Sequence, residues 1–539
     1  MMETNRREFL KHMGWGLAGL YAVAGLPRET FAAPNRTFKL PRAIPETQGV
    51  SSTGLLDFIN AVESRKLNVH SVMVVRHGQV VAEGWWAPYS PTLKHTLYSL
   101  SKSFTSTAVG LAVAEGRLSV EDKVVSFFPN DVPATISTNL AAMRVKDLLT
   151  MSTGHDKDTT AAVRGGSDPN WVKTFLAQPV DHQPGTHFVY NSGATYMLSA
   201  IVQKLTGQPV LAYLKPRLFD PLGIEGADWE VDPNGICVGG WGLRVKTEDI
   251  AKFGQMYLQK GMWNGKRILP EAWIADATRF QVQSAGGSRP KEQNDWLQGY
   301  GYQFWRCRHD AYRGDGAFGQ YCIVLPKEDA VVAITSETGD MQAVMDEVWT
   351  HILGGFRSGS LPADATAHQQ LTKKLAALSM PLPVVSSTSP LVSQISGKTF
   401  AVDANSMGVK TVGLNFGKEG CLFTMRNEQG EHRILCGLGR RVEGETGLSV
   451  IPIKLVPTPV PGETKTKVSA SGTWTDPNTF EMVWRFNETA HYDRVTCRFD
   501  GDQVQVTFTK SLVVLNPNTK DDRPVLHGKV MTSTLSQGK

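Results

Sequence analysis

The order of strand-like and helix-like segments is the feature that most restricts the fold of this chain. Two β-branched runs, 71–75 and 80–83, flank the turn His77-Gly78-Gln79 and predict a hairpin. Residues 117–290 then have a mainly helical, loop-rich pattern. Strand character returns after this stretch, at 300–307, 319–326 and 330–336. Strands at both ends predict an α+β fold, in which one antiparallel sheet is flanked by helices and a helical subdomain is inserted between its strands.

Helical periodicity predicts the longer helices of this first domain. In the earliest of them, Phe104, Ala108 and Leu111 recur at helical spacing, and Gly116 is a typical stop. The four predicted helices span 101–116, 194–206, 247–259 and 341–353.

The composition changes around Gly354 and divides the chain. Residues 40–356 form the predicted first domain, and 357–391 read as a linker that contains one short helix near 363–378 and a Pro/Ser-rich run. Residues 392–539 contain short alternating strands separated by Gly, Asn and Asp turns. This pattern predicts a separate C-terminal antiparallel β domain, either a sandwich or a small barrel.

The first 33 residues have the layout of an export signal. Arg6-Arg7 precedes an apolar stretch at 13–26 that is rich in Gly and Ala, and Ala32-Ala33 suits a signal peptidase. A membrane anchor would need about 20 strongly apolar residues, and this run is shorter. We therefore expect a twin-arginine signal peptide at 1–33, a periplasmic mature protein and no transmembrane segment after signal removal.

Charge and cysteine content exclude several function classes. The 539 residues carry 56 Lys and Arg against 51 Asp and Glu, a net charge of +5 without a dense basic stripe, so no nucleic-acid partner is expected. None of the six cysteines forms a C-x-x-C pair, and neither a metal site nor a redox motif is predicted. Cys421 and Cys436 flank a predicted hairpin turn; a disulfide and free thiols both remain open, with free thiols favoured.

The strongest chemical signal is the segment Ser99-Leu100-Ser101-Lys102 at the start of the predicted helix 101–116. Residues three positions apart share a helix face, so the Lys102 amine can approach the Ser99 hydroxyl. A desolvated lysine with a lowered pKa can remove the serine proton, which makes Ser99 a candidate nucleophile. The pattern alone is weak, and a helix-capping serine with a surface lysine is its ordinary interpretation.

Two further segments support the catalytic interpretation. Tyr190 in Tyr190-Asn191-Ser192 precedes a predicted helix, and a tyrosine beside an ammonium group can titrate low enough to relay protons. The glycines of Gly314-Asp315-Gly316 let a strand edge approach a ligand, so the Ala317 amide can join the Ser99 amide as an oxyanion hole. A core tyrosine and a glycine-rich hairpin are the ordinary alternatives.

In this order, the three segments resemble the motifs of the serine β-lactamase and penicillin-binding-protein family. They are similar in particular to the branch of class C β-lactamases, esterases and 6-aminohexanoate-dimer hydrolases. Residues 145–154, 239–243 and 249–254 are also similar to family stretches. The resemblance covers about residues 45–355 and implies a β-lactamase/transpeptidase-like fold there. It does not extend to the C-terminal β domain.

Two departures from the family pattern bear on the substrate. Ser192 stands where the lactamases have Asn, and Gly314 stands where the third motif usually carries Lys or His. That cation helps to hold a substrate carboxylate, and Asp315 would repel an anion if it pointed inward. Strand alternation argues against Arg313 compensating from the adjacent position.

We therefore expect a serine hydrolase that forms an acyl-enzyme on Ser99, with Lys102 and Tyr190 as base and acid, acting on a small ester or amide. A β-lactamase, a D-Ala-D-Ala carboxypeptidase or an impaired penicillin-binding sensor is the alternative. No cofactor is required. Cell-wall contact through the β domain is one possible interaction, and a cap over the active site is the other. The residues predicted to contact substrate are Ser192, Gly314, Asp315, Gly316 and Trp241.

His155-Asp156 and Asp181-His182 are the other histidine–aspartate pairs in the sequence. A pair of this kind is more often a loop hydrogen bond than half of a catalytic triad. Ser99 already has a base in Lys102, and the chain lacks a G-x-S-x-G elbow, an H-E-x-x-H motif and a Walker loop.

Overall fold

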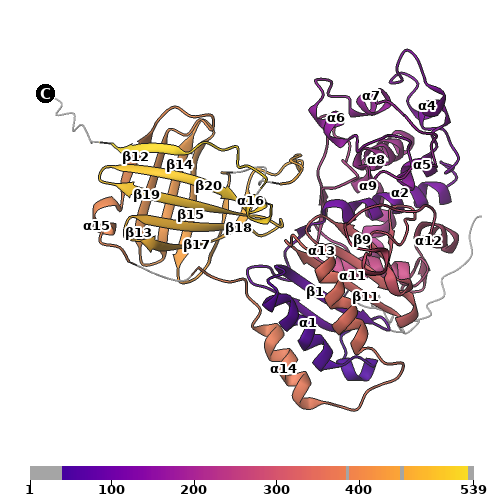
Figure 1. Ribbon diagram of the computed structural model, residues 1–539, viewed down its shortest axis with the longest axis horizontal. Helices are drawn as coiled ribbons and strands as arrows, with labels where there is room; N and C mark the ends of the chain where they lie inside the picture. Colours follow the sequence, from indigo (N-terminus) through magenta and orange to yellow (C-terminus); the bar gives the residue numbers. More distant parts are fainter. Residues whose placement is uncertain (1–38, 384–387, 449–453, 517, 532–539) are drawn as a thin grey trace, which may run out of the picture. The chain divides into compact units, whose positions relative to one another are not determined.

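The computed structural model describes residues 39–383, 388–448, 454–516 and 518–531 (Figure 1). The predicted signal peptide at 1–33 lies outside the described residues. Among the helices that the structure describes, none combines the length and apolar character needed to cross a bilayer.

A six-stranded antiparallel sheet forms the centre of the first domain, and its strand order is β2-β1-β11-β10-β9-β8. The N-terminal strand β1 pairs directly with the late strand β11, so the sheet is assembled from both ends as predicted. Its strands are β1 Val69–Arg76, β2 Gln79–Trp85, β8 Trp305–Arg306, β9 Tyr312–Gly316, β10 Gln320–Leu325 and β11 Ala330–Ser336.

Both faces of this sheet are buried, because successive side chains of its apolar strands alternate between two hydrophobic clusters. Val72 and Val74 face one cluster, which contains residues of α1 (Ser52–Ser64), α13 (Met341–Glu347) and α14 (Ala365–Ala376). Met73 and Val75 face the other, which contains residues of α2 (Ser101–Ala114), α8 (Ser192–Thr206) and α11 (Thr247–Leu258). Helices thus cover both sides of the sheet (Figure 1).

The inserted subdomain between β2 and β8 is mainly helical, as expected. Helix α8 packs against α5 and against α2, the helix that contains Lys102. The subdomain is thereby joined to the Ser99–Lys102 segment. Its remaining helices are α3 Val124–Phe127, α4 Thr138–Ala142, α5 Val145–Leu149, α6 Thr160–Gly165, α7 Trp171–Leu176, α9 Val210–Leu214, α10 Asp220–Leu222 and α12 Glu271–Thr278. Short strand pairs accompany them: β3 His95–Thr96, β4 Asp228–Trp229, β5 Leu243–Val245, β6 Met262–Trp263 and β7 Lys266–Arg267.

The four predicted helices are present within a few residues of their expected bounds, except that the last continues from Glu347 as a π-helix, Val348–Ile352. The predicted strand at 300–307 is wrong for most of its length, since only Trp305–Arg306 is a strand. Gly299 has φ 107° and Gln303 has φ 64°, and these left-handed residues turn the chain where a strand would have to run straight.

The helix predicted in the linker is α14, and it packs against α1 and β2. Leu371, Leu378 and Met380 are buried in the same cluster as α1, and the Met380 amide donates to the Ala87 carbonyl. This segment is therefore packed onto the first domain.

The C-terminal domain is a closed β barrel, the second of the two predicted possibilities. Nine of its described strands form a closed ring, because β15 also pairs in parallel with β17. The tenth described strand, β16, pairs with β17 outside this ring. Its interior is filled with side chains such as Phe400, Phe423 and Trp484. The strands are β12 Lys398–Val402, β13 Thr411–Gly417, β14 Gly420–Asn427, β15 Gly430–Leu438, β16 Val442–Thr446, β17 Thr466–Asp476, β18 Thr479–Phe486, β19 Tyr492–Asp500, β20 Gln503–Lys510 and β21 Leu526–Val530, with short helices α15 Val392–Ile395 and α16 Ser511–Leu515.

Cys421 and Cys436 lie directly opposite each other on β14 and β15, as the hairpin predicts. Both are buried free thiols, as are the other four cysteines, all of which belong to the described part of the chain.

Candidate active site

Ser99 and Lys102 are brought together at the start of α2. Ser99 lies in the short 3₁₀ turn Tyr98–Leu100 that leads into the helix. The Lys102 Nζ donates to Ser99 Oγ at 3.0 Å, to Ser192 Oγ at 2.9 Å and to the Gly240 carbonyl at 2.7 Å. Ser99 is half-buried, whereas Lys102 is 1% exposed. The Ser99 hydroxyl can therefore contact a substrate, while the Lys102 amine is shielded from solvent.

Burial lowers the pKa of Lys102 to about 7, although the charges of Asp158 and Asp315 oppose the shift. A neutral lysine amine has two protons and one lone pair. Its two N–H groups can donate hydrogen bonds to Ser192 Oγ and to the Gly240 carbonyl, which leaves the lone pair directed at the Ser99 hydroxyl. This arrangement suits Lys102 to act as a general base near neutral pH.

Tyr190 lies beside this pair. The Lys102 Nζ is 4.8 Å from the centre of the Tyr190 ring, and the Tyr190 and Ser99 side chains share a hydrogen bond. Burial, reinforced by the charge of Asp315, raises the pKa of Tyr190. This direction is opposite to the low titration expected from a neighbouring ammonium, because burial has the larger effect. Tyr190 is therefore a neutral phenol that can donate a proton.

The two residues after Tyr190 have different tasks. Ser192 contacts Lys102 directly, in the position where the lactamases have Asn. Asn191 is fully buried, and its Oδ1 accepts hydrogen bonds from the Gly193 and Thr159 amides, so it caps α8. The Asp158 Oδ1 accepts from the Ser192 amide at 3.1 Å.

Strand β9 lies against the chain that enters Ser99. A Cβ atom on Gly316 would lie 2.0 Å from the Leu97 carbonyl oxygen and 3.1 Å from the Ser99 nitrogen. Only a glycine allows this approach. Gly316 thus lies beside the Ser99 amide, and the next residue in the chain, Ala317, supplies the second amide of the predicted oxyanion hole.

The other residues of the third motif divide between the two faces of β9. Gly314 lies against α2, since a Cβ there would be 2.4 Å from Leu100 Cδ1 and 2.5 Å from Ser103 Oγ. Arg313 and Asp315 point to the opposite face. They form a buried ion pair, with Arg313 Nη2 2.9 Å from Asp315 Oδ2. The Arg313 charge is therefore matched by a carboxylate.

A sequence model of the Beta-lactamase family matches residues 58–355. This chain belongs to the beta-lactamase family. The predicted family and enzyme class are confirmed: the chain is a member of the serine hydrolase superfamily, whose members include ester and amide hydrolases and penicillin-binding proteins.

Two curated proteins and one solved structure are among the proteins similar to this chain. The chain is 25% identical over 290 residues to the 6-aminohexanoate-dimer hydrolase of Paenarthrobacter ureafaciens, a match that covers 50% of this chain and 72% of that protein. It is 25% identical over 299 residues to penicillin-binding protein 4 of Amycolatopsis lactamdurans, covering 49% and 77%. The solved structure of a family VIII carboxylesterase aligns with a TM-score of 0.44 and 15% identity, covering 58% of this chain and 99% of that one.

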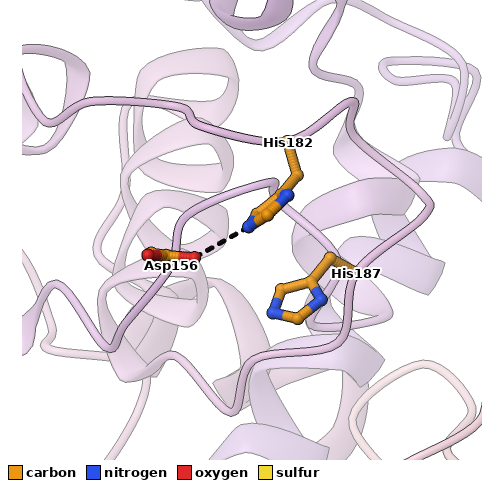
Figure 2. A group of neighbouring side chains, drawn as sticks. All are labelled: Asp156, His182 and His187. Carbon is orange, nitrogen blue, oxygen red and sulfur yellow. Dashed lines mark hydrogen bonds and ion pairs between the residues drawn. The ribbon is translucent and has the colours of Figure 1, made fainter.

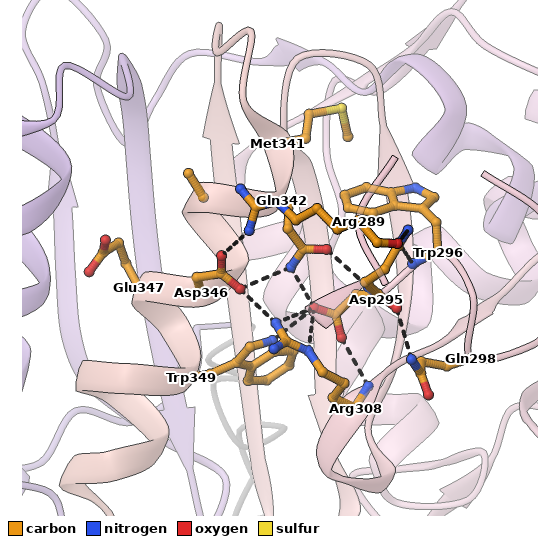
Figure 3. A network of polar contacts seen from close by, with 12 residues as sticks. Arg289, Asp295, Trp296, Gln298, Arg308, Met341, Gln342, Asp346, Glu347 and Trp349 are labelled. Atoms are coloured by element: carbon orange, nitrogen blue, oxygen red, sulfur yellow. Dashed lines mark hydrogen bonds and ion pairs between the residues drawn. The ribbon is translucent and has the colours of Figure 1, made fainter. Parts of the chain in front are cut away.

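In this beta-lactamase-family chain, a buried polar network surrounds Asp295 (Figure 3). The Arg313 Nη1 donates to the Asp295 carbonyl at 2.8 Å. The Asp295 carboxylate accepts hydrogen bonds from Arg308, Gln342 and Trp349. Burial raises the pKa of Asp295, but the Arg308 hydrogen bond and the Arg313 charge outweigh it and lower the pKa to about 2. The Asp295 carboxylate therefore stays ionised, and the Asp295 carbonyl holds the Arg313 side chain of β9 in place.

Trp241 has a different position from the one expected of a substrate contact. Its side chain is buried, and its Nε1 donates to Thr458 Oγ1 at 2.9 Å. Trp241 is connected to the active site through its backbone, because the carbonyl of the preceding residue, Gly240, accepts a hydrogen bond from Lys102.

Asp156, His182 and His187 form the one group of possible metal ligands in the described chain (Figure 2). The His182 Nε2 and the Asp156 Oδ1 lie 2.7 Å apart in a hydrogen bond, and the His187 ring lies 4.4 Å from that of His182. Asp156 and His182 therefore form a loop hydrogen bond, and His155 bonds separately to Thr153.

A cavity of about 530 Å³ lies outside this constellation, and none of the predicted site residues lines it. Arg244 in its wall is paired, since its Nε lies 2.6 Å from Asp228 and its Nη1 lies 2.7 Å from Glu463. Because the cavity is separate from Ser99 and Lys102, we assign it no part in the reaction.

Sequence reasoning missed three residues of the site. Asp158 caps the turn at Ser192 and opposes the pKa shift of Lys102, and Gly240 accepts from Lys102. Trp305 donates a hydrogen bond to the buried Asp315. The stretch 239–243 did carry a signal, since it is similar to a family segment. Asp158 and Trp305 belong to no motif.

Replacing Gly316 with alanine tests the close approach of β9. The new Cβ would overlap the Leu97 carbonyl oxygen. Because neither a backbone carbonyl nor a Cβ can rotate away, β9 must shift away from Ser99. We expect a loss of about 1–3 kcal/mol in the free energy of unfolding and a fall in kcat of about 100-fold. Gly444→Ala is the matched control, because a Cβ on that strand glycine would meet nothing within 4 Å. Urea unfolding and ester turnover measure both effects; equal behaviour of the two variants would contradict the packing argument.

Proposed function

We propose that this chain is an exported hydrolase that cleaves small esters or amides through an acyl-enzyme on Ser99. One observation carries the proposal: the buried Lys102 Nζ lies 3.0 Å from Ser99 Oγ, in surroundings that lower its pKa to about 7. A serine hydroxyl needs such a base to become a nucleophile.

The reaction follows from the protonation states of the three residues. Neutral Lys102 takes the Ser99 proton as the oxygen attacks the substrate carbonyl, and the Ser99 and Ala317 amides stabilise the negative oxygen. Tyr190 donates its phenolic proton to the leaving group and regains a proton from the Lys102 ammonium. Water, deprotonated in turn by Lys102, then releases the acyl group from Ser99.

The third motif supports a substrate without an essential carboxylate. Gly314 provides no charge, and the Arg313 charge is matched by Asp315 in a buried ion pair. Among the described residues, the third motif therefore offers no unpaired cation to hold the carboxylate of a penicillin or a peptidoglycan stem. The similarity to a 6-aminohexanoate-dimer hydrolase and to a carboxylesterase agrees with a neutral ester or amide as the group attacked.

A penicillin-binding sensor that is acylated and released slowly is the second candidate. The similarity to penicillin-binding protein 4 favours it. In that case Ser99 would react as above, but the acyl group would remain attached. A β-lactamase or a D-Ala-D-Ala carboxypeptidase would instead turn its substrate over.

A substrate panel on the mature protein distinguishes these activities: short-chain p-nitrophenyl esters, an amide oligomer, nitrocefin and a D-Ala-D-Ala peptide. We expect turnover of the esters or the amide and little of the other two. Intact-mass measurement after incubation with penicillin accompanies the panel. A long-lived adduct without ester or amide turnover would replace the hydrolase proposal with the sensor.

Export by the twin-arginine route is tested by replacing Arg6 and Arg7 with lysines. We expect the variant to stay in the cytoplasm while the wild type is recovered from the periplasm, because the route reads the arginine pair. Cell fractionation and the mass of the mature N-terminus measure this. Arg28→Lys, in the same segment, is the control and should be exported. Periplasmic recovery of the double variant would exclude this route.

A further inference from the structure

We propose that the C-terminal β barrel is a working part of the active site, with His491 as a positioning residue for Ser99. This inference rests on the proposed role of Ser99 as nucleophile. It goes further, because it gives the barrel a task in catalysis and names the residue that performs it.

The first contact reaches the residue before the nucleophile. Tyr98 is buried and has a left-handed backbone with φ 46°, which a non-glycine side chain adopts only when its surroundings hold it there. Its hydroxyl is hydrogen-bonded to His491 Nε2 and accepts from the Leu455 amide at 3.3 Å. Both partners come from the second half of the chain. The backbone that presents Ser99 is thus held through the Tyr98 side chain.

His491 is itself held in place. It immediately precedes β19, and its Nδ1 lies 2.7 Å from Glu337 Oε1 and 3.2 Å from Ser511 Oγ. His491 and Glu337 are 2% and 1% exposed at their side chains. Glu337 follows β11 of the first domain. The imidazole therefore bridges two parts of the hydrolase domain, Tyr98 and Glu337, with one ring nitrogen for each.

The same imidazole also touches the other side of the predicted oxyanion hole. The Phe318 ring packs edge-on against His491 at 5.2 Å and against Tyr98 at 5.5 Å between ring centres. Phe318 directly follows Ala317 and has a left-handed φ of 67°. His491 thus contacts the chain neighbour of each predicted oxyanion amide, Tyr98 beside Ser99 and Phe318 beside Ala317.

A second part of the C-terminal half supports the residue that accepts from Lys102. Thr458 accepts from Trp241 Nε1 at 2.9 Å and donates to Glu230 Oε2. Lys454 pairs with Glu230 at 2.6 Å, with both side chains 2% or less exposed. Trp241 follows Gly240, the Lys102 acceptor. The C-terminal half therefore contacts Tyr98, which precedes Ser99, and Trp241, which follows the Lys102 acceptor Gly240.

The test uses the full chain with His491→Ala, His491→Gln and the control His432→Ala. Each is assayed for kcat and KM on a p-nitrophenyl ester, with rates normalised to the sites labelled by a fluorophosphonate. The His491 side chain is buried and contacts Tyr98 and Phe318, the neighbours of Ser99 and Ala317. We therefore expect kcat to fall about 10- to 100-fold in His491→Ala with KM nearly unchanged. Glutamine can accept from Tyr98 and donate to Glu337, so it should restore most of kcat.

His432 is a half-buried histidine of β15 that bonds only to Asn427 among the described residues, and its removal should leave kcat unchanged. If His491→Ala does not fold, Tyr98→Phe removes one hydroxyl from the same contact and should lower kcat in the same way. Wild-type kcat per labelled site in His491→Ala, or in Tyr98→Phe, would overturn the inference. A parallel Ser99→Ala sample separates the two proposals: if it keeps full turnover, the nucleophile assignment fails, and not the role of His491.

Discussion

Replacing Ser99 with alanine is expected to reduce ester turnover by about 10⁴-fold or more. The change removes a hydroxyl that both Lys102 and Tyr190 contact, the only such hydroxyl in the described ranges, so no acyl-enzyme can form. The predicted oxyanion amides of residue 99 and Ala317 remain in the variant, so we expect residual catalysis over water. Steady-state hydrolysis of p-nitrophenyl acetate measures the loss, and intact-mass analysis after fluorophosphonate treatment should find one label on the wild type and none on the variant.

Ser106→Ala, in the helix α2 that directly follows the Ser99 turn, is a matched control. The Ser106 hydroxyl is buried and has no hydrogen-bond partner among the described residues, so its removal should cost neither activity nor labelling. Equal turnover in Ser99→Ala and Ser106→Ala would exclude Ser99 as the nucleophile.

The Ser99–Lys102 contact was predictable because one turn of helix sets it. Such a contact needs no knowledge of distant parts of the chain. Ser192 was also found, through its place after Tyr190, although its direct hydrogen bond to Lys102 appears only in the structure. The protonation of Tyr190 was not predictable from its neighbours, since the burial that raises its pKa depends on how several segments pack around it.

The fold follows the same division between local and distant effects. The sheet built from both ends was predicted because strand and helix periods are local signals. Closure of the barrel depends on β15 pairing with β17 across a long connection, and no local pattern carries that register. The contact between Tyr98 and His491 joins residues 393 positions apart, so its role emerges only in three dimensions.

The rate of ester hydrolysis is expected to depend on the charge of Lys102. Burial lowers the pKa of this amine to about 7, and only its neutral form can accept the Ser99 proton. The kcat/KM should therefore rise about tenfold per pH unit below pH 7, reach half its maximum near pH 7 and level off above it. Lys102→Met should lower kcat by about 10³-fold and remove this dependence. A rate that is flat from pH 5 to pH 9 in the folded wild type, checked by circular dichroism, would exclude lysine as the base.

Asp158→Asn gives this pH profile a direction that a general loss of stability cannot imitate. The Asp158 charge raises the pKa of Lys102, so removing it must lower that pKa and shift the midpoint of the profile toward acid. The asparagine oxygen can still accept from the Ser192 amide, as Asp158 Oδ1 does, which keeps the turn before α8 in place. Asp156→Asn is the matched control, because Asp156 lies in the same loop and is no source of the Lys102 shift. An alkaline shift, or equal profiles for the two variants, would contradict Lys102 as the group that titrates.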